Sequence, residues 1–335
     1  MTNKRILVTG ATGFVGRHLV AALLARGSHL SLAVRSDQRV DPIVRSNELV
    51  RVICCGDLAD AELSSAFTDI DRVVHVAGLA HVAKADADSA AAKFEKANVA
   101  ATKSLVMESL RHDLRTFINI SSIRSVAGNT SAVYITDDTN PAPDGEYGKS
   151  KLAAERIVSE QLGRHCMAIS LRPPLIVGAD ARGNWANLQK LARSGLPLPF
   201  ASIRNQRHYL SIQTLIEALC HLLDRPARPD QSGNYCIADP QPITLPALIT
   251  QLRRGMGLGP RLFSCPPFVF DWIGAATGRR RQLAALTGPL HIDATRFNQT
   301  FEFESTLSLD EAIRISGAGF NSLARSTNSH RQDMR

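Results

Sequence analysis

The segment TGATGFVG, residues 9–16, constrains the fold of this chain more than any other feature. It places Gly10, Gly13 and Gly16 between the apolar run RILVTG (5–10) and a stretch at 14–27 whose apolar residues recur at helical spacing. Glycine lets a backbone turn tightly and approach a phosphate closely, and a helix N-terminus offers free N–H groups to that phosphate. A strand, a glycine loop and a helix in this order predict a dinucleotide-binding site.

Short apolar runs alternate with helical patterns over the first two-thirds of the chain, which predicts an α/β fold with a Rossmann-type doubly wound parallel sheet. After the first strand, further strands are expected at 31–35, 50–56, 72–78, 116–121 and 168–172, and helices around 91–112 and 148–163. Beyond Arg172-Pro173-Pro174, apolar helices near 185–193, 211–223 and 245–254 are separated by loops rich in Pro and Gly. We therefore expect a dinucleotide-binding domain at 1–175, a smaller and mostly helical lobe at 176–320 whose segments interleave with the first domain, and a mobile tail at 321–335.

The bulk composition is that of a soluble globular protein, with 44% hydrophobic and 21% charged residues. No apolar run approaches the roughly 18 residues of a membrane span, and the N-terminus lacks the features of a signal peptide. The six cysteines form neither a CxxC nor a metal-ligand spacing, which favours a reduced, cytoplasmic setting and no metal. The net charge is +8, but aromatic residues are only 5% and no basic stripe interleaved with aromatics is present, so nucleic acid is not an expected partner.

The end of the second expected strand indicates which dinucleotide is bound. An NAD site usually carries an Asp or Glu there for the ribose 2′-hydroxyl, whereas an Arg accommodates a 2′-phosphate. Here the strand ends Ala33-Val34-Arg35-Ser36, and the first acid is Asp37. This pattern favours NADP, with NAD as the alternative.

The chain resembles the extended short-chain dehydrogenase/reductase family, which includes the NAD-dependent epimerases and dehydratases, over about 310 residues. The motifs that carry the resemblance, in chain order, are TGATGFVG, Asp57-Leu58 after the third strand, HVAG (75–78), Asn98-Val99, Ser121-Ser122, YGKSK (147–151), Arg172-Pro173-Pro174 and Val177-Gly178. The resemblance implies cofactor contacts from Gly10, Thr12, Gly13, Phe14, Val15, Gly16, Arg35, Asp57, Leu58, Val76, Ala77, Gly78, Asn98, Tyr147, Lys151 and Pro173.

The same resemblance implies that Tyr147, Lys151 and Ser122 are catalytic. Tyr147 and Lys151 stand four residues apart and share one helix face. A lysine ammonium one turn away and an oxidised nicotinamide both favour the phenolate of a tyrosine whose ordinary pKa, about 10, is too high for a base. Ser122 precedes Tyr147 by 25 positions and is expected to hydrogen-bond the reacting oxygen. Asn98 is expected to position the neighbouring segments rather than to react.

The segment after Ser122 departs from the family pattern. It reads IRSVAGN where the family commonly ends in VYG, so Ile123 and Arg124 are expected to face the site in place of small polar residues. Dehydratases of the family usually have an Asp-Glu pair here, and this chain has no such acids. A dehydratase is therefore disfavoured.

The second lobe resembles a narrower group: bacterial enzymes of surface-polysaccharide synthesis that act on UDP-activated N-acetylhexosamines or their 4-keto-6-deoxy derivatives. The resemblance, carried by residues 181–200 and RNQRHYLSI (204–212), implies that Asn184 and Arg207 contact the nucleotide diphosphate. His81 and Lys84 follow the fourth strand and are candidates for the sugar pocket, and Arg280 is a candidate for the diphosphate.

Two reactions remain open. A 4-reductase would use exchangeable NADPH to reduce a UDP-4-keto-6-deoxy-N-acetylhexosamine to a 4-hydroxy sugar such as UDP-N-acetylquinovosamine. A 4-epimerase of UDP-N-acetylglucosamine or UDP-glucose would retain a bound NAD. Arg35 favours the reductase. A non-catalytic nucleotide sensor of the same fold is a distant alternative, because such relatives typically lack the Tyr or the Lys. Family members often dimerise through the helices that include the Tyr–Lys segment, so a homodimer is expected.

Overall fold

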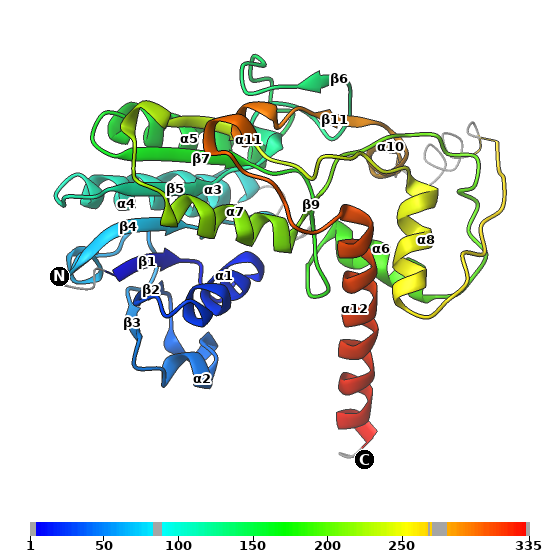
Figure 1. Cartoon of the computed structure of the whole chain (residues 1–335), viewed down its shortest axis with the longest axis horizontal. Helices are drawn as coiled ribbons and strands as arrows, with labels where there is room; N and C mark the ends of the chain where they lie inside the picture. The colour runs from blue at the N-terminus through cyan, green and yellow to red at the C-terminus, as the bar shows by residue number, and fades with distance from the viewer. Residues whose placement is uncertain (1–4, 83–88, 267–268, 270–279, 333–335) are drawn as a thin grey trace.

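The computed structural model describes residues 5–82, 89–266, 269 and 280–332, with the side chains of 280–282 and 325–332 left out. Its centre is a seven-stranded sheet in the order β10-β7-β5-β4-β1-β2-β3 (Figure 1). Every pair of neighbouring strands in this sheet is parallel. The strands are β1 (Arg5–Thr9), β2 (Leu30–Val34), β3 (Val50–Cys54), β4 (Ile70–His75), β5 (Thr116–Ile120), β7 (Met167–Arg172) and β10 (Gly233–Cys236).

The strand order reverses between β1 and β4, because the chain runs outward from β1 to β3 and then returns to the other side of β1. In open α/β sheets ligands bind outside the carboxyl ends of the strands at such a switch point. The glycine loop after β1 and the HVAG segment, which spans the end of β4 and the residues after it, both lie at this point. The expected Rossmann-type doubly wound sheet is confirmed, and the six strands expected from apolar runs are all present.

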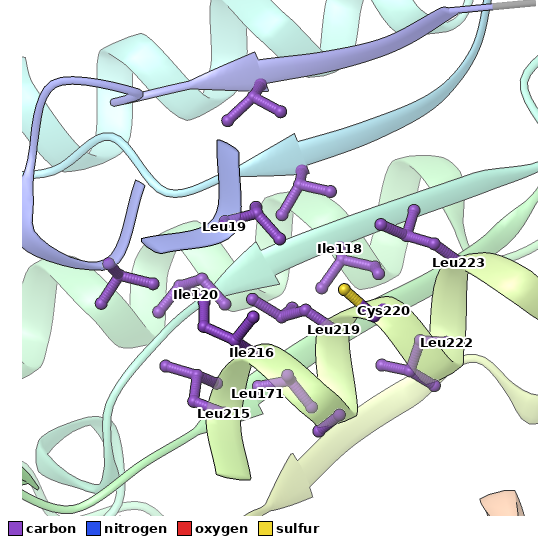
Figure 2. Close-up of a cluster of buried hydrophobic side chains, with 14 of the residues drawn as sticks. Leu19, Ile118, Ile120, Leu171, Leu215, Ile216, Leu219, Cys220, Leu222 and Leu223 are labelled. Carbon is purple, nitrogen blue, oxygen red and sulfur yellow. The ribbon is translucent and has the colours of Figure 1, made fainter. Parts of the chain in front are cut away.

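Helices cover both faces of the sheet, as doubly wound topology requires. One face is covered by α1 (Phe14–Ala25) and α7 (Ile212–Asp224), and the other by α4 (Ala101–Ser109) and α5 (Glu146–Leu162). Figure 2 shows the first face, where Leu19 of α1 and Leu215, Ile216 and Leu219 of α7 pack over Ile118 of β5. This layer fixes the carboxyl ends of the central strands relative to the helices that follow them.

A second lobe lies beside the carboxyl ends of the strands. It contains α6 (Asn184–Arg193), α8 (Leu245–Gly255) and α12 (Leu309–Gln332), which stand together to one side of the sheet in Figure 1. The remaining elements are short and are α2 (Pro42–Arg45), α3 (Ala90–Phe94), β6 (Ser131–Ile135), β8 (Ile176–Val177), β9 (Leu210–Ser211), α10 (Arg280–Thr287), β11 (Leu290–Ile292) and α11 (Thr295–Phe301). The helical C-terminal region expected from the sequence is therefore present.

A buried arginine in α8 ties the second lobe together. Arg253 is fully buried and donates to the backbone carbonyl oxygens of Ala192 at 3.1 Å, Leu196 at 2.6 Å, Pro260 at 2.5 Å and Arg261 at 3.3 Å. One guanidinium thus donates to four carbonyl groups, one at the end of α6 and three in the loops beside it.

The C-terminal segment contains the last helix. Within residues 321–335, which the sequence predicts to be a mobile tail, α12 continues to Gln332. Among the described residues, no helix combines the length and the apolar character that crossing a membrane requires.

Candidate active site

The turn between β1 and α1 is closed by backbone contacts that leave room only for glycine. Gly10 has a positive φ of 70°, and a Cβ on it would lie 2.6 Å from the backbone nitrogen of Ala77. A Cβ on Gly16 would lie 2.1 Å from the carbonyl oxygen of Gly10. Gly13, the exposed residue before α1, provides no side-chain cap, so the first turn of α1 keeps N–H groups available to a phosphate. This geometry fits the diphosphate of a dinucleotide.

The other residues of the loop have different surroundings. Thr12 is half-buried, and the side chain of Val15 is buried in the main core. Phe14 packs against both the main core and the core of the second lobe, and a Cβ on Gly178 would lie 2.6 Å from its ring. Phe14 therefore joins the glycine loop to the second lobe.

The residues expected at the adenosine end of the cofactor lie close together. Arg35, just beyond β2, is three-quarters exposed, and its Nη2 lies 3.9 Å from Oδ2 of Asp57. Lys96 lies on the other side, with its Nζ 3.8 Å from the same oxygen. Asp37, the first acid after β2, pairs with Arg45 at 3.2 Å. The exposed group at the end of β2 is thus a guanidinium and not a carboxylate. Leu58 is partly buried beside this group.

The residues after β4 lead from the glycine loop to the catalytic helix. Val76 packs partly against the main core, and Ala77 contacts Gly10 as described above. A Cβ on Gly78 would lie 3.0 Å from both Oδ1 of Asn98 and Nζ of Lys151. Glycine at position 78 keeps this space free of a side chain.

Asn98 is a buried positioning residue. It lies in η4 (Glu95–Ala100), a π-helical turn within the helical stretch that contains α3 and α4. Its Nδ2 donates to the carbonyl of Leu79 at 3.0 Å and to Oγ of Ser150 at 2.9 Å, while its Oδ1 accepts from the Leu79 N–H at 2.7 Å. These bonds link the segment after β4 to α5.

Tyr147 lies in the first turn of α5 beside Ser122, which follows β5. The Ser122 side chain lies close enough to the Tyr147 phenol to affect its pKa, and the Tyr147 ring packs against Phe94 with centroids 5.8 Å apart. Burial raises the pKa of Tyr147, while the neighbouring Ser122 and the charge of Arg124 oppose that rise. Ser121 bonds a different group, described below, so Ser122 is the serine that meets Tyr147.

Lys151 is buried one turn beyond Tyr147 on the same face of α5. Its Nζ donates to the carbonyl oxygen of Ile120 at 2.9 Å. Burial lowers the pKa of Lys151 to about 8, and the charge of Glu155 opposes that effect. The neighbouring His75 bonds Oγ1 of Thr9 at 2.7 Å, and burial together with the Lys151 charge lowers the pKa of His75 to about 3. His75 is therefore neutral at neutral pH.

Glu155 is a residue that the sequence analysis missed. It is fully buried and accepts from Oγ of Ser121 at 2.5 Å, Oγ of Ser125 at 2.7 Å, and Nε and Nη2 of Arg172 at 3.0 and 2.8 Å. Ser121 and Ser125 flank Ser122, so Glu155 holds the turn that presents Ser122. Glu155 lies four residues after Lys151, on the helix face that also carries Tyr147. This spacing could have identified it from the sequence.

The expectation for residues 123 and 124 needs correction. Ile123 does not face the site, because its side chain is buried in a small hydrophobic cluster with Val126 and Ile135. Its N–H donates to the carbonyl of Pro173 at 2.9 Å, which brings Pro173 beside this turn. Arg124 lies near Tyr147, as expected for a residue facing the site.

The structure places two of the expected substrate residues near each other. His81 packs against Gly183, where an added Cβ would lie 2.6 Å from the His81 ring nitrogen Nε2. Asn184 follows directly as the first residue of α6 and is exposed. Lys84 lies outside the described residues, and so does the side chain of Arg280, at the start of α10.

Arg207 is buried and not a surface charge. Its Nη1 donates to the carbonyl of Gly288 at 2.8 Å, and its Nη2 donates to the carbonyl of Asn129 at 2.9 Å. These bonds connect the chain before β9 with the segments that form β6 and β11. Burial lowers the pKa of the Arg207 guanidinium.

The glycine loop at the switch point and the grouping of Ser122, Tyr147 and Lys151 at the carboxyl ends of the strands define a Rossmann-type enzyme that uses a nicotinamide dinucleotide. The sequence pattern of the NAD dependent epimerase/dehydratase family matches residues 6–238, and the chain belongs to this family.

Individual relatives agree with this assignment. The chain is 28% identical to UDP-glucose 4-epimerase of Vibrio cholerae over 323 residues, which cover 95% of both chains. It is 25% identical over 267 residues to a 4-hydroxy-2-methyl-3-oxo-4-farnesyl-3,4-dihydroquinoline-1-oxide ketoreductase of Stigmatella aurantiaca, covering 78% of this chain and 76% of the relative. In fold it is similar to UDP-glucuronic acid 4-epimerase from Bacillus cereus in complex with NAD, with a TM-score of 0.75, 19% identity, and coverage of 95% of this chain and 99% of the other.

Proposed function

We propose that this enzyme is an NADP(H)-dependent oxidoreductase acting at carbon 4 of a UDP-sugar, and that it reduces a UDP-4-keto-6-deoxy-N-acetylhexosamine to a 4-hydroxy sugar such as UDP-N-acetylquinovosamine. The observation that carries the proposal is the exposed guanidinium of Arg35 at the end of β2, where an NAD site would carry an acid. A 2′-phosphate matches this group in charge and geometry. A cofactor that is exchanged at each turnover suits a reductase better than an epimerase.

The catalytic roles follow from the contacts of each side chain. When bound, the reduced nicotinamide supplies the hydride that carbon 4 of the keto sugar accepts. Tyr147 donates its phenolic proton to the oxygen on carbon 4, and the hydroxyl of the neighbouring Ser122 holds the same substrate oxygen. Lys151, whose ammonium is held by its bond to the Ile120 carbonyl, lies one turn away on the same helix face and supplies positive charge for the phenolate that remains.

The uridine diphosphate and the sugar are assigned to the boundary between the sheet and the second lobe. His81 and Asn184 lie close together there and suit the sugar and the diphosphate. We assign Arg207 a role in shaping the diphosphate site, and Lys84 and Arg280 remain candidates for the sugar and the diphosphate.

A second candidate function is the 4-epimerase. The Vibrio cholerae relative, similar over nearly the whole of both chains, is a UDP-glucose 4-epimerase. The same Tyr147, Ser122 and Lys151 would remove the proton from a 4-hydroxyl and later return it. Such an enzyme must retain its cofactor throughout the cycle.

Nicotinamide absorbance distinguishes the two reactions. The purified enzyme is mixed with UDP-4-keto-6-deoxy-N-acetylglucosamine and either NADPH or NADH. We expect stoichiometric oxidation that is faster with NADPH. Conversion of UDP-N-acetylglucosamine to its 4-epimer without added reductant, together with no NADPH oxidation, would establish the epimerase instead.

The variant Tyr147→Phe tests whether the protein is an enzyme or a non-catalytic nucleotide sensor. Loss of the phenolic proton should lower turnover by about a hundredfold or more, while the affinity for NADPH stays unchanged. Tyr134→Phe, at an exposed tyrosine on β6, is the control. Full turnover in Tyr147→Phe would rule out the proposed mechanism.

A further inference from the structure

The excess of positive charge in this chain comes from two segments of the second lobe. Residues 183–216 and 240–266 contain seven arginine and lysine residues and no aspartate or glutamate, whereas the rest of the chain is nearly neutral, with 32 basic and 31 acidic residues. Arg207 and Arg253 are buried. The other five cations are exposed, and they are Lys190, Arg193, Arg204, Arg254 and Arg261.

The two segments meet at a short parallel bridge. The N–H of Leu198 donates to the carbonyl of Arg261 at 3.0 Å, and the N–H of Phe263 donates to the carbonyl of Leu198 at 3.0 Å. In Figure 1 the two stretches of chain run side by side at the edge of the molecule, beyond α8 as seen from the sheet. These stretches, residues 194–204 and 257–265, are named the paired loops.

Side chains alternate between the two faces of such a bridge. Leu198 is paired with Leu262, and both pack against the core of the second lobe. Arg261 and Phe263, on either side of Leu262, therefore point outward, and Phe263 is 50% exposed. Leu196 is 64% exposed, and Nη1 of Arg261 donates to the carbonyl of the residue before it at 3.3 Å. Two large apolar side chains and a cation thus lie together on the outer surface of the paired loops.

The positive charge of this surface is not offset by carboxylates. None of the five exposed cations forms an ion pair within the part of the chain that the structure describes. The guanidinium of Arg253, beneath the paired loops, bonds carbonyl groups, so its charge adds to the local field. The helix α12, which packs on α8, carries two acids, but Asp310 accepts from Gln251 at 2.7 Å and Glu311 pairs with Arg314.

We propose that the paired loops dock on a membrane surface that contains anionic phospholipids. The cations attract the negatively charged headgroups, and Leu196 and Phe263 enter the boundary between the headgroups and the acyl chains. A nucleic acid would match the charge, but binding of single strands relies on a series of aromatic rings on which bases stack, and this surface has one. The inference goes beyond the proposed function and does not depend on which sugar the enzyme uses.

Co-sedimentation of the full-length enzyme with lipid vesicles tests the proposal. We expect binding to vesicles of equal parts phosphatidylcholine and phosphatidylglycerol, little binding to phosphatidylcholine alone, and release at high salt, because salt screens the attraction. Combining Arg254→Gln with Arg261→Gln should weaken binding about tenfold or more. The matched control combines Arg111→Gln with Arg156→Gln, which removes two exposed cations from the first domain, and it should bind as the parent protein does.

The apolar side chains give a second set of variants. Phe263→Ser and Leu196→Ser should each weaken binding severalfold, whereas Ile43→Ser, at a side chain 79% exposed on α2, should not. An unchanged affinity for NADPH shows that each variant is folded. The proposal would be overturned if the parent protein did not bind the phosphatidylglycerol vesicles, or if the controls lost as much binding as the variants in the paired loops. Tighter binding to a single-stranded DNA oligonucleotide than to these vesicles would overturn it as well.

Discussion

Arg172 and Glu155 form a buried ion pair beneath the turn that presents Ser122, with Nη2 of Arg172 2.8 Å from Oε2 of Glu155. Both side chains are almost fully buried, at 3% and 0% exposure. Arg172 ends β7 and Glu155 lies midway along α5, so the pair joins the sheet to the catalytic helix directly below the reacting groups.

Removing one partner of this pair should be costly. Glu155→Gln leaves the Arg172 guanidinium buried without its ion-pair partner, and we expect the free energy of unfolding to fall by about 3 kcal/mol. Urea unfolding measures the loss. The matched control is Glu146→Gln, an exposed glutamate on the same helix, which should change stability by less than about 0.5 kcal/mol. Equal stabilities for the two variants would contradict the structure.

Substitution by alanine should have different effects on stability and NADPH binding at two glycines of the first βα unit. Gly16→Ala drives a methyl group onto the carbonyl oxygen of Gly10, so we expect NADPH binding to be lost and stability to fall by about 3 kcal/mol. Gly27→Ala meets no atom within 4 Å and is opposed only by its φ of +72°, which should cost about 1 kcal/mol. Thermal unfolding and NADPH titration compare the two. Retained cofactor affinity in Gly16→Ala would show that the loop is looser than described.

His75 should make the protein less stable in mild acid. Its folded pKa, about 3, lies below the ordinary value of 6.5. Between these values the unfolded chain binds a proton that the folded protein excludes, so stability is fully present above pH 6.5 and declines as the pH falls toward 3. The decline approaches about 1.4 kcal/mol per pH unit. Urea unfolding at pH 7 and pH 5 should show a smaller difference for His75→Asn than for the parent protein, and an identical difference would refute the assignment.

Arg253 should be essential to the second lobe for reasons unrelated to its charge. Arg253→Met removes the side-chain donor to the carbonyls of Leu196 and Pro260, and one of two donors to those of Ala192 and Arg261, so we expect a loss of about 3 kcal/mol. Lysine cannot reach all four groups, so Arg253→Lys should recover only part of the stability. The adjacent Arg254, which is exposed, provides the control Arg254→Met. Denaturant unfolding gives the comparison, and a stable Arg253→Met would show that these carbonyls find other partners.

Arg35 should determine the cofactor preference. Arg35→Ala removes the guanidinium proposed to hold the 2′-phosphate, and the affinity for NADPH should fall on the order of tenfold or more, with that for NADH little changed. The control is Arg111→Ala. Arg111 is an exposed arginine just after α4 and pairs with Glu108 of that helix. Fluorescence titration of both cofactors measures the ratio. An unaltered ratio would favour NAD and hence the epimerase.

The sequence predicted those parts of the site that depend on local spacing. The glycine loop, six of the seven strands of the sheet, and the Tyr147–Lys151 spacing each lie within one short segment, so their residue types and intervals are readable directly. The seventh strand, β10, was not predicted. Ser122 was reached by its interval to Tyr147, and the structure brings the two hydroxyl groups together.

Features that depend on contacts between distant segments were not predictable in the same way. Glu155 shows its importance only when β5, η5 (Ile123–Ser125) and β7 converge on it. Ile123 was expected to face the site because it follows Ser122, but the pairing of β6 with β11 creates a cluster that buries it. The ion pair of Arg124 with Asp144 likewise needs the fold to bring a turn and a helix start together.

Because β10 pairs with β7, the sheet is completed only by residues far beyond the first half of the chain. The chain leaves the sheet after β7, passes through α6 and β9, covers the sheet again with α7 and only then adds β10 to its edge. A fragment ending near residue 175 would therefore expose the whole hydrogen-bonding edge of β7 and the apolar surface that α7 covers. Open strand edges of this kind recruit other chains. Expressed alone, such a fragment should aggregate instead of folding into a separate cofactor-binding unit, and the protein should unfold as one cooperative body.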